Sequence, residues 1–238
     1  MAVFPGGCDS SRMLQLIMRN IIADEVEVED VSNLWSEIDL WGHSAMGIFR
    51  TAFETVPSRG QVLEWRGSFS FLGRYAGEDQ SIRLLVPASV KNEWWQRLQE
   101  AGAVTGTGEE LQRSRILAGL PAVPEDVGAS DLPNEAGLET VAVSYTKGCY
   151  LGQEVTNRLK TMGQVRRRLH VLQGSGTPPA PHTELYQQGR KVGEIRSAAQ
   201  SDDGFVALAM LTLLQLDVAA GLSCAAESPA NMRIARPV

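Results

Sequence analysis

The pattern of apolar residues changes after Gly163, and no other feature constrains the fold of this 238-residue chain as strongly. From Val165 onward, apolar and polar residues alternate in short runs that Gly-rich turns separate, and the spacing typical of helices is absent. Short alternating runs of this kind predict a small β-barrel or sandwich. We therefore expect a boundary near Met162, with one domain at residues 1–162 and a β-barrel domain at 163–238.

The first of these domains mixes helix and strand patterns. Apolar residues recur at helical spacing in four stretches, at 11–20, 43–53, 90–101 and 109–117. Strand patterns occur at 25–29, 35–40, 62–65, 69–71 and 82–86. We expect a tight turn at Arg66-Gly67 and a helix cap at Ser89, and this order of elements predicts an α+β domain. Residues 119–137 are rich in Pro and Gly and predict a long loop, which is often functional.

The composition is that of a globular protein. Hydrophobic residues make up 43% of the chain and charged residues 21%, which excludes a disordered tail or a coiled coil. No apolar run approaches the ~18 residues that a membrane helix needs, and no signal-peptide pattern is visible, so we expect a cytoplasmic protein. The net charge of -6 argues against a general attraction to nucleic acid. Three cysteines and three histidines, widely spaced, argue against a disulfide framework or a metal site.

The stretch from Lys147 to Glu154, KGCYLGQE, carries the candidate chemistry. Glycines flank Cys149 and its aromatic neighbour, so a tight turn that exposes the thiol is physically reasonable. Lys147 would favour the thiolate and lower the pKa of the thiol, and a helix that starts near Gly152 would add partial positive charge. The alternative is that Cys149 is a small buried apolar residue, as free cysteines often are.

KGCYLGQE resembles the signature of the folate-binding YgfZ family, which is related to the glycine-cleavage T-protein, an aminomethyltransferase. Other residues follow in the order that the family shows: Arg115, Ala118-Gly119-Leu120-Pro121, Pro133-Asn134-Glu135, Arg158 and Gly163. The segment from Gly189 to Ile195 resembles the T-protein's C-terminal barrel. The resemblance implies an α+β fold in which a partial aminomethyltransferase-like folate-binding domain precedes a small C-terminal β-barrel.

The function that the resemblance implies is a tetrahydrofolate-binding accessory role in iron–sulfur cluster assembly or repair. The cofactor would be tetrahydrofolate or a one-carbon derivative. Partners would be iron–sulfur client enzymes, including one that modifies tRNA, or assembly factors, with no direct nucleic-acid or membrane partner. Cys149 matches the family's functional thiol. The residues implied to bind the cofactor are Lys147, Tyr150, Gln153, Glu154, Arg158 and Arg115, and no metal ligand is implied.

Two departures from the T-protein pattern limit this analogy. Leu117 stands where aminomethyltransferases carry the Glu that reads the pterin, so an acceptor is lost and ordinary aminomethyl transfer is disfavoured. Full-length relatives also carry further N-terminal sequence, so we expect a truncated member with an incomplete folate site and an exposed sheet edge. Two other functions stay open: an aminomethyltransferase-like one-carbon transfer, and a partner-binding scaffold with a vestigial folate site.

Other polar and aromatic candidates have structural explanations as well. The basic run 166–168 could contact phosphate, polyglutamate or RNA, but a solvated strand edge is the favoured interpretation. Arg158 could contact the ligand or pair with Glu154, which lies four residues earlier. Trp94 is expected to pack in the core rather than against a pterin, and His170 is expected on a strand surface.

Overall fold

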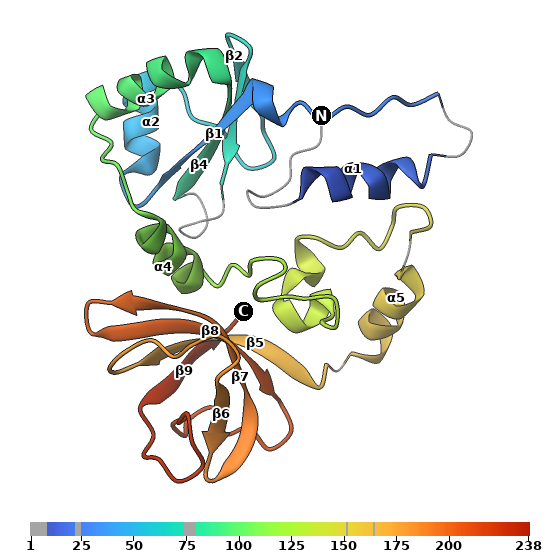
Figure 1. Ribbon diagram of the computed structural model, residues 1–238, viewed down its shortest axis with the longest axis vertical. Coiled ribbons are helices and arrows are strands. Elements are labelled where there is room, and N and C mark those ends of the chain that lie inside the picture. The colour runs from blue at the N-terminus through green and yellow to red at the C-terminus, as the bar shows by residue number, and fades with distance from the viewer. Residues whose placement is uncertain (1–8, 22–24, 74–79, 151, 164) are drawn as a thin grey trace. The chain divides into compact units, whose positions relative to one another are not determined.

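The computed structural model describes residues 9–21, 25–73, 80–150, 152–163 and 165–238 (Figure 1). The chain divides into two compact units, one of residues 1–73 and 79–104 and one of residues 74–78 and 105–238. This division groups residues 105–162 with the C-terminal sheet. The domain boundary near Met162 therefore stays a prediction about where a separable barrel begins.

The first unit is a four-stranded antiparallel sheet with helices on one face. Its elements are α1 (Ser10–Met18), η1 (Ser32–Leu34), β1 (Trp35–Trp41), α2 (Ala45–Phe53), β2 (Leu63–Trp65), β3 (Ser68–Leu72), β4 (Ser81–Pro87), η2 (Ala88–Val90) and α3 (Lys91–Glu100). The strand order is β1-β4-β3-β2. Ile38, Ile82 and Leu84 of the sheet pack against Phe49 of α2 and Trp94 of α3. Trp94 is thus a core residue, as its helical position predicts.

Most local predictions for the first unit are confirmed and two are wrong. The helix at 11–20 is present as α1, and Arg66 and Gly67 take φ of 50° and 72°, as a two-residue hairpin turn requires. Residues 25–29 form no strand, because alternation alone does not supply a partner strand, and Val26 is 54% exposed. Ser89 does not cap α3, since it lies inside the short helix η2 that precedes it.

The second unit is built on a five-stranded antiparallel sheet in the order β6-β7-β8-β5-β9. Its elements are α4 (Gly108–Ala118), η3 (Pro133–Ala136), η4 (Leu138–Thr140), α5 (Gln153–Met162), β5 (Arg167–Gly174), β6 (Glu184–Gln187), β7 (Arg190–Ser201), β8 (Gly204–Thr212) and β9 (Met232–Pro237). The ladder is open, but Leu222 bridges to Met232 and Ser223 to Tyr186, so this short segment links the two edge strands. The C-terminal part is therefore β-rich, as the alternating runs predict.

Both faces of the C-terminal sheet are covered. On the inner face, Leu172, Phe205 and Leu211 pack in one core. On the outer face, Ile116 of α4 and Val127 of the 119–137 loop pack against a second set that includes Leu208. A strand buried on both faces reads as a continuous apolar run, which explains the stretch from Phe205 to Leu211.

The burial of His170 differs from its predicted position. This residue was expected on a strand surface, but it lies on β5 with only 3% of its surface exposed. Its Nδ1 lies 2.9 Å from the carbonyl oxygen of Arg168, and burial lowers the pKa of the imidazole. The expectation failed because His170 pairs with Ala209, which belongs to the inner core, so its side chain lies on the inner face of a strand flanked by β8 and β9.

Candidate functional site

Cys149 lies in the turn that leads into α5. The residue is exposed, so it is not a buried apolar residue of the core. The helix begins at Gln153, immediately after Gly152, which takes φ of +86° and therefore favours glycine. Gly148 needs no such conformation, since it is absent from the positive-φ glycines and an added Cβ there would meet no atom within 4 Å. The thiol is thus presented at the surface just before a helix.

Lysine and tyrosine side chains pair around this turn. The Nζ atom of Lys147 lies 4.9 Å from the ring centroid of Tyr150, and that of Lys160 lies 4.3 Å from the ring centroid of Tyr145. These are cation–π distances. The hydroxyl of Tyr150 is buried and has no hydrogen-bond partner among the described residues. Buried polar atoms are normally satisfied, so this oxygen is a group that a ligand or water would complete.

The other residues predicted in this segment lie on α5. Gln153 is half-buried, and Glu154 and Arg158 are exposed one helical turn apart. Glu154 lies in the first turn, where the helix dipole favours a carboxylate. Six of the predicted site residues thus lie in one short stretch of sequence, Lys147, Cys149, Tyr150, Gln153, Glu154 and Arg158, and the contact described between them joins Lys147 and Tyr150.

Arg115 lies in a separate, buried hydrogen-bond network. Its guanidinium donates to Gln112, the carbonyl oxygen of Leu120, the carboxylate of Asp126 and the hydroxyl of Ser197. These contacts use four of the five N–H groups of the side chain. The Arg115 and Asp126 side chains are 8% and 0% exposed. The arginine therefore anchors α4 and the following loop to β7.

A second charged cluster was missed by the sequence analysis. Arg167 of β5 donates to both carboxylate oxygens of Glu135, at 2.8 and 3.0 Å, and lies 2.9 Å from Asp131. Arg196 of β7 lies 3.1 Å from the same Asp131, whose side chain is fully buried. The hydrogen bond to Glu135 raises the pKa of Arg167. The basic run 166–168 and the acidic residues of the 119–137 loop were visible in the sequence, but their pairing was not, because the partners lie 30 or more residues apart in the chain.

The basic run 166–168 has a mixed role. Arg167 is held by the cluster just described, and Arg168 lies 3.6 Å from Glu139. The favoured interpretation, a solvated strand edge, is therefore wrong for these two residues, since both form ion pairs with the loop and η4. Arg166 is exposed.

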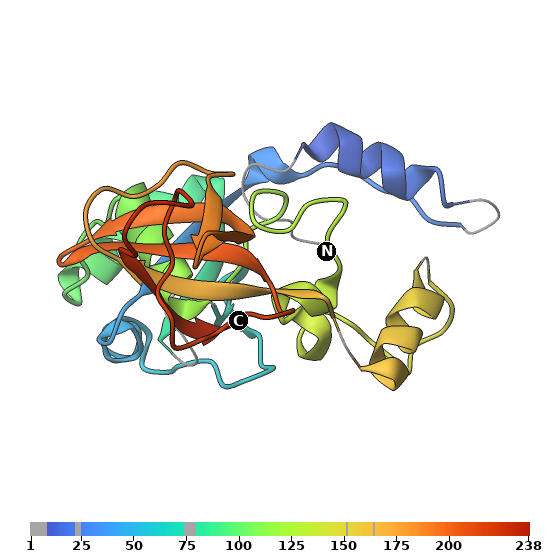
Figure 2. The same cartoon turned by 90° about the horizontal axis from the view of Figure 1, so that it is seen from below.

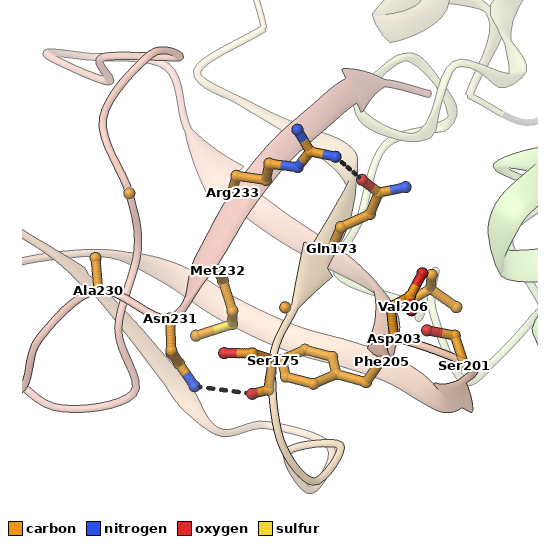
Figure 3. Close-up of a pocket in the computed structure, with 12 residues that line it drawn as sticks. Gln173, Ser175, Ser201, Asp203, Phe205, Val206, Ala230, Asn231, Met232 and Arg233 are labelled. Carbon is orange, nitrogen blue, oxygen red and sulfur yellow. Dashed lines mark hydrogen bonds between the residues drawn. The ribbon is translucent and has the colours of Figure 1, made fainter.

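A pocket of about 620 Å³ lies away from these residues, at one end of the C-terminal sheet (Figure 3). It is lined by the end of β5, the β7–β8 turn and the start of β9. Arg233 donates to the side chain of Gln173 at 2.6 Å, and Asn231 approaches the carbonyl oxygen of Ser175. None of the predicted site residues lines this pocket.

The C-terminal sheet matches a known domain family. Residues 166–237 match the family model of the CAF17 C-terminal beta-barrel domain. This domain is of the CAF17 type. The bridges at Leu222 and Ser223 explain why an open ladder belongs to a barrel family, since they join its two edge strands.

Curated relatives extend the match beyond the CAF17-type domain. The iron–sulfur cluster assembly factor IBA57 of human mitochondria is 34% identical over 145 residues, which is 55% of this chain and 39% of that protein. The tRNA-modifying protein YgfZ of Sodalis glossinidius is 30% identical over 129 residues, which is 52% of this chain and 39% of that protein. The aminomethyltransferase of a Nostoc species is 28% identical over 193 residues, which is 78% of this chain and 51% of that protein. The chain thus spans about half the length of these relatives or less, and the predicted kinship with YgfZ is confirmed.

A solved structure shows the fold. The glycine cleavage system aminomethyltransferase T from Bartonella henselae matches with a TM-score of 0.64 and 19% identity, over 79% of this chain and 54% of that one. At this identity the match concerns the fold alone. The chain therefore has the predicted aminomethyltransferase-like fold, in which mixed helices and sheet precede the CAF17-type domain. No helix of the described residues is both long and apolar enough to cross a membrane.

Proposed function

We propose that this chain acts as an accessory protein in iron–sulfur cluster assembly or repair, in the manner of YgfZ and IBA57. The observation that carries the proposal is the similarity to human IBA57, a cluster assembly factor, at 34% identity over 145 residues. Its partners would be iron–sulfur enzymes, including one that modifies tRNA, or assembly factors. We infer the cytoplasm as the compartment, although the human relative is mitochondrial.

Cys149 is the functional group that we propose for this role. A thiol acts as a nucleophile or ligand only when it is accessible and deprotonated. Cys149 is exposed in the turn before α5, two residues after Lys147, whose ammonium lies over the Tyr150 ring. Cys224 is exposed as well, but partial desolvation raises the pKa of its thiol and lowers its thiolate fraction. Of the two thiols among the described residues, Cys149 is therefore the better candidate.

Reduced folate is the cofactor that we propose. Its tail is anionic, and Lys147 and Arg158 are exposed cations before and after the thiol in the sequence. The buried, unpartnered hydroxyl of Tyr150 offers a hydrogen-bonding atom to a ligand. These residues fit the ligand's chemistry, whereas Arg115 is committed to the protein's own groups. When bound, reduced folate would carry one-carbon units.

Complementation tests the role. In a bacterial strain that lacks its own YgfZ, this chain should restore iron–sulfur enzyme activity, and Cys149→Ser should abolish the restoration. The exposed position predicts that this variant keeps its free energy of unfolding within about 0.5 kcal/mol. Cys224→Ser is the matched control and should restore activity fully. Restoration by Cys149→Ser would remove the thiol from the proposal and favour a scaffold, and no restoration by the wild-type chain would contradict the proposed role.

Thermal unfolding tests the cofactor. A ligand that binds only the native state stabilises it by about 2.7 kcal/mol at a hundred times its dissociation constant. Tetrahydrofolate should therefore raise the melting temperature, and Arg158→Ala should reduce the rise. The chain without ligand provides the baseline for each variant. An unchanged melting temperature of the wild-type chain at high folate concentration would show that the folate site is absent.

The likeness to the Nostoc aminomethyltransferase favours a second function, aminomethyl transfer. Leu117 argues against it, because its side chain cannot accept a hydrogen bond from a pterin and 45% of its surface is exposed. A glycine-cleavage assay separates the two functions. Turnover by this chain would favour transfer over the accessory role.

A further inference from the structure

The segment 141–166, here called the cationic segment, differs in charge from the rest of the chain. It holds four basic residues, Lys147, Arg158, Lys160 and Arg166, and one acidic residue, Glu154, so its net charge is +3. The whole chain has a net charge of -6, which leaves -9 for all other residues. A positive stretch of this kind on a negative protein creates a local potential that selects anionic partners.

The lysines of the cationic segment are held by aromatic rings. Lys147 lies over Tyr150 and Lys160 lies over Tyr145, and no carboxylate of the described residues forms an ion pair with either ammonium group. Elsewhere a lysine is neutralised by a carboxylate, as Lys191 is by Glu184. A ring attracts a cation through its quadrupole but carries no formal charge. The two ammonium charges are therefore positioned and still uncompensated.

These charges flank the exposed thiol in the sequence. Lys147 lies two residues before Cys149, and the contact between Lys160 and Tyr145 ties the end of α5 to the turn that carries the thiol. The stretch that precedes α5 lies next to this helix in both views (Figures 1 and 2). Arg166 is exposed six residues after Lys160. The turn that carries Cys149 therefore has a positive charge at Lys147 and, through Tyr145, a contact with a second one at Lys160.

We propose that the cationic segment is a docking surface for an acidic protein surface. This inference deepens the proposed function, on which it rests, by stating the chemistry of the partner that meets Cys149. A protein face is favoured over RNA for two reasons. The -9 charge of the remaining chain repels an extended polyanion outside the segment. The lysines also cover one face of each tyrosine ring, on which an unpaired base would otherwise stack.

Binding of fluorescein-labelled decaglutamate, measured by anisotropy without folate, tests the surface. The wild-type chain should bind the peptide, and affinity should fall as salt rises from about 50 to about 300 mM, because exposed charges are screened over about 10 Å or less. The double variant Lys160→Glu/Arg166→Glu should bind at least about tenfold more weakly. It leaves every residue proposed for folate or for the thiol unchanged.

The matched control is Arg19→Glu/Lys91→Glu, which makes the same change in net charge at two exposed residues of the first unit. Its affinity should stay within about twofold of the wild type, because these charges lie outside the cationic segment. The charge-conserving variant Lys160→Arg/Arg166→Lys should still bind decaglutamate. If circular dichroism shows that Lys160→Glu/Arg166→Glu misfolds, the single variant Lys160→Glu replaces it. Equal loss in both charge-reversed variants, or no loss in either, would overturn the inference.

Decauridylate is the competing probe. Tighter binding of this RNA than of the peptide, lost in Lys160→Glu/Arg166→Glu, would show a nucleic-acid surface and overturn the proposal.

Complementation distinguishes failure of the docking surface from failure of the accessory role. If the wild-type chain restores enzyme activity while decaglutamate does not bind, the accessory role stands and the docking surface is wrong. If decaglutamate binds as expected without complementation, the surface stands and the accessory role is wrong.

Discussion

Asp126→Asn is expected to lower the free energy of unfolding of residues 105–238 by about 3–5 kcal/mol. Asp126 is completely buried, and its carboxylate accepts hydrogen bonds from the guanidinium of Arg115 and, at 2.8 Å, from the amide of Ala122. Removing the carboxylate charge leaves the Arg115 guanidinium buried without its counter-charge, which costs far more than the pair itself contributes.

Urea denaturation followed by far-ultraviolet circular dichroism measures this loss. All five tryptophans lie in residues 35–95, so their fluorescence reports the first unit separately. The control is Asp202→Asn. It breaks the exposed ion pair between Asp202 and Arg113, which lies on α4 like Arg115. That ion pair should contribute less than about 1 kcal/mol to the free energy of unfolding, because the side chain of Asp202 is 94% exposed. Equal effects of the two variants would contradict the assignment of Arg115 to a structural network.

Gly193→Ala is expected to destabilise the C-terminal sheet by about 3 kcal/mol or more, at the upper end of overpacking costs. Gly193 lies on β7, and a Cβ added there would collide with the backbone carbonyl oxygen of Met210 and would lie 3.0 Å from the Cα of Leu211 on β8. Both are backbone atoms, so no side-chain rotation relieves the collision. The two strands would have to separate where β7 and β8 pair.

Hydrogen exchange of β7 and β8 amides measures this effect, because local opening free energies report which strands lose protection. Gly148→Ala is the control, since an added Cβ at Gly148 meets no atom within 4 Å. It should change stability by no more than about 0.5 kcal/mol. Full protection of β8 in the Gly193→Ala variant would show that the added Cβ is accommodated without opening the sheet, and would contradict this prediction.

The local patterns of the chain were sufficient for many elements. The run from Ile82 to Val86 became a central strand, and the turn at Arg66-Gly67 formed because Gly67 tolerates positive φ. The motif around Cys149 indicated an exposed turn before a helix, and both are present. These features depend on residues close together in the sequence.

Other local patterns misled because a strand needs a partner. Residues 25–29 alternate well and form no strand, while β9 was missed although it pairs with β5. The sequence of β9 contains little alternation and ends on Pro237, which an edge strand tolerates. Pairing in a sheet is thus decided by the neighbour as much as by the strand itself.

The change from mixed to β-rich structure, the exposed thiol turn and the kinship with YgfZ could all be predicted from the amino-acid sequence. The use of the charged and buried polar groups could not, because it depends on long-range contacts in the folded chain. Arg115, a predicted folate contact, meets Ser197 across 82 positions of sequence, and Arg167 meets Glu135 across 32. His170 is likewise buried on a face of β5 that it shares with Ala209 of β8, a strand distant in the sequence. Hydrophobic periodicity reports which face of an element is buried, but the counter-charge of a buried ion is set by contacts between distant residues, which no local pattern encodes.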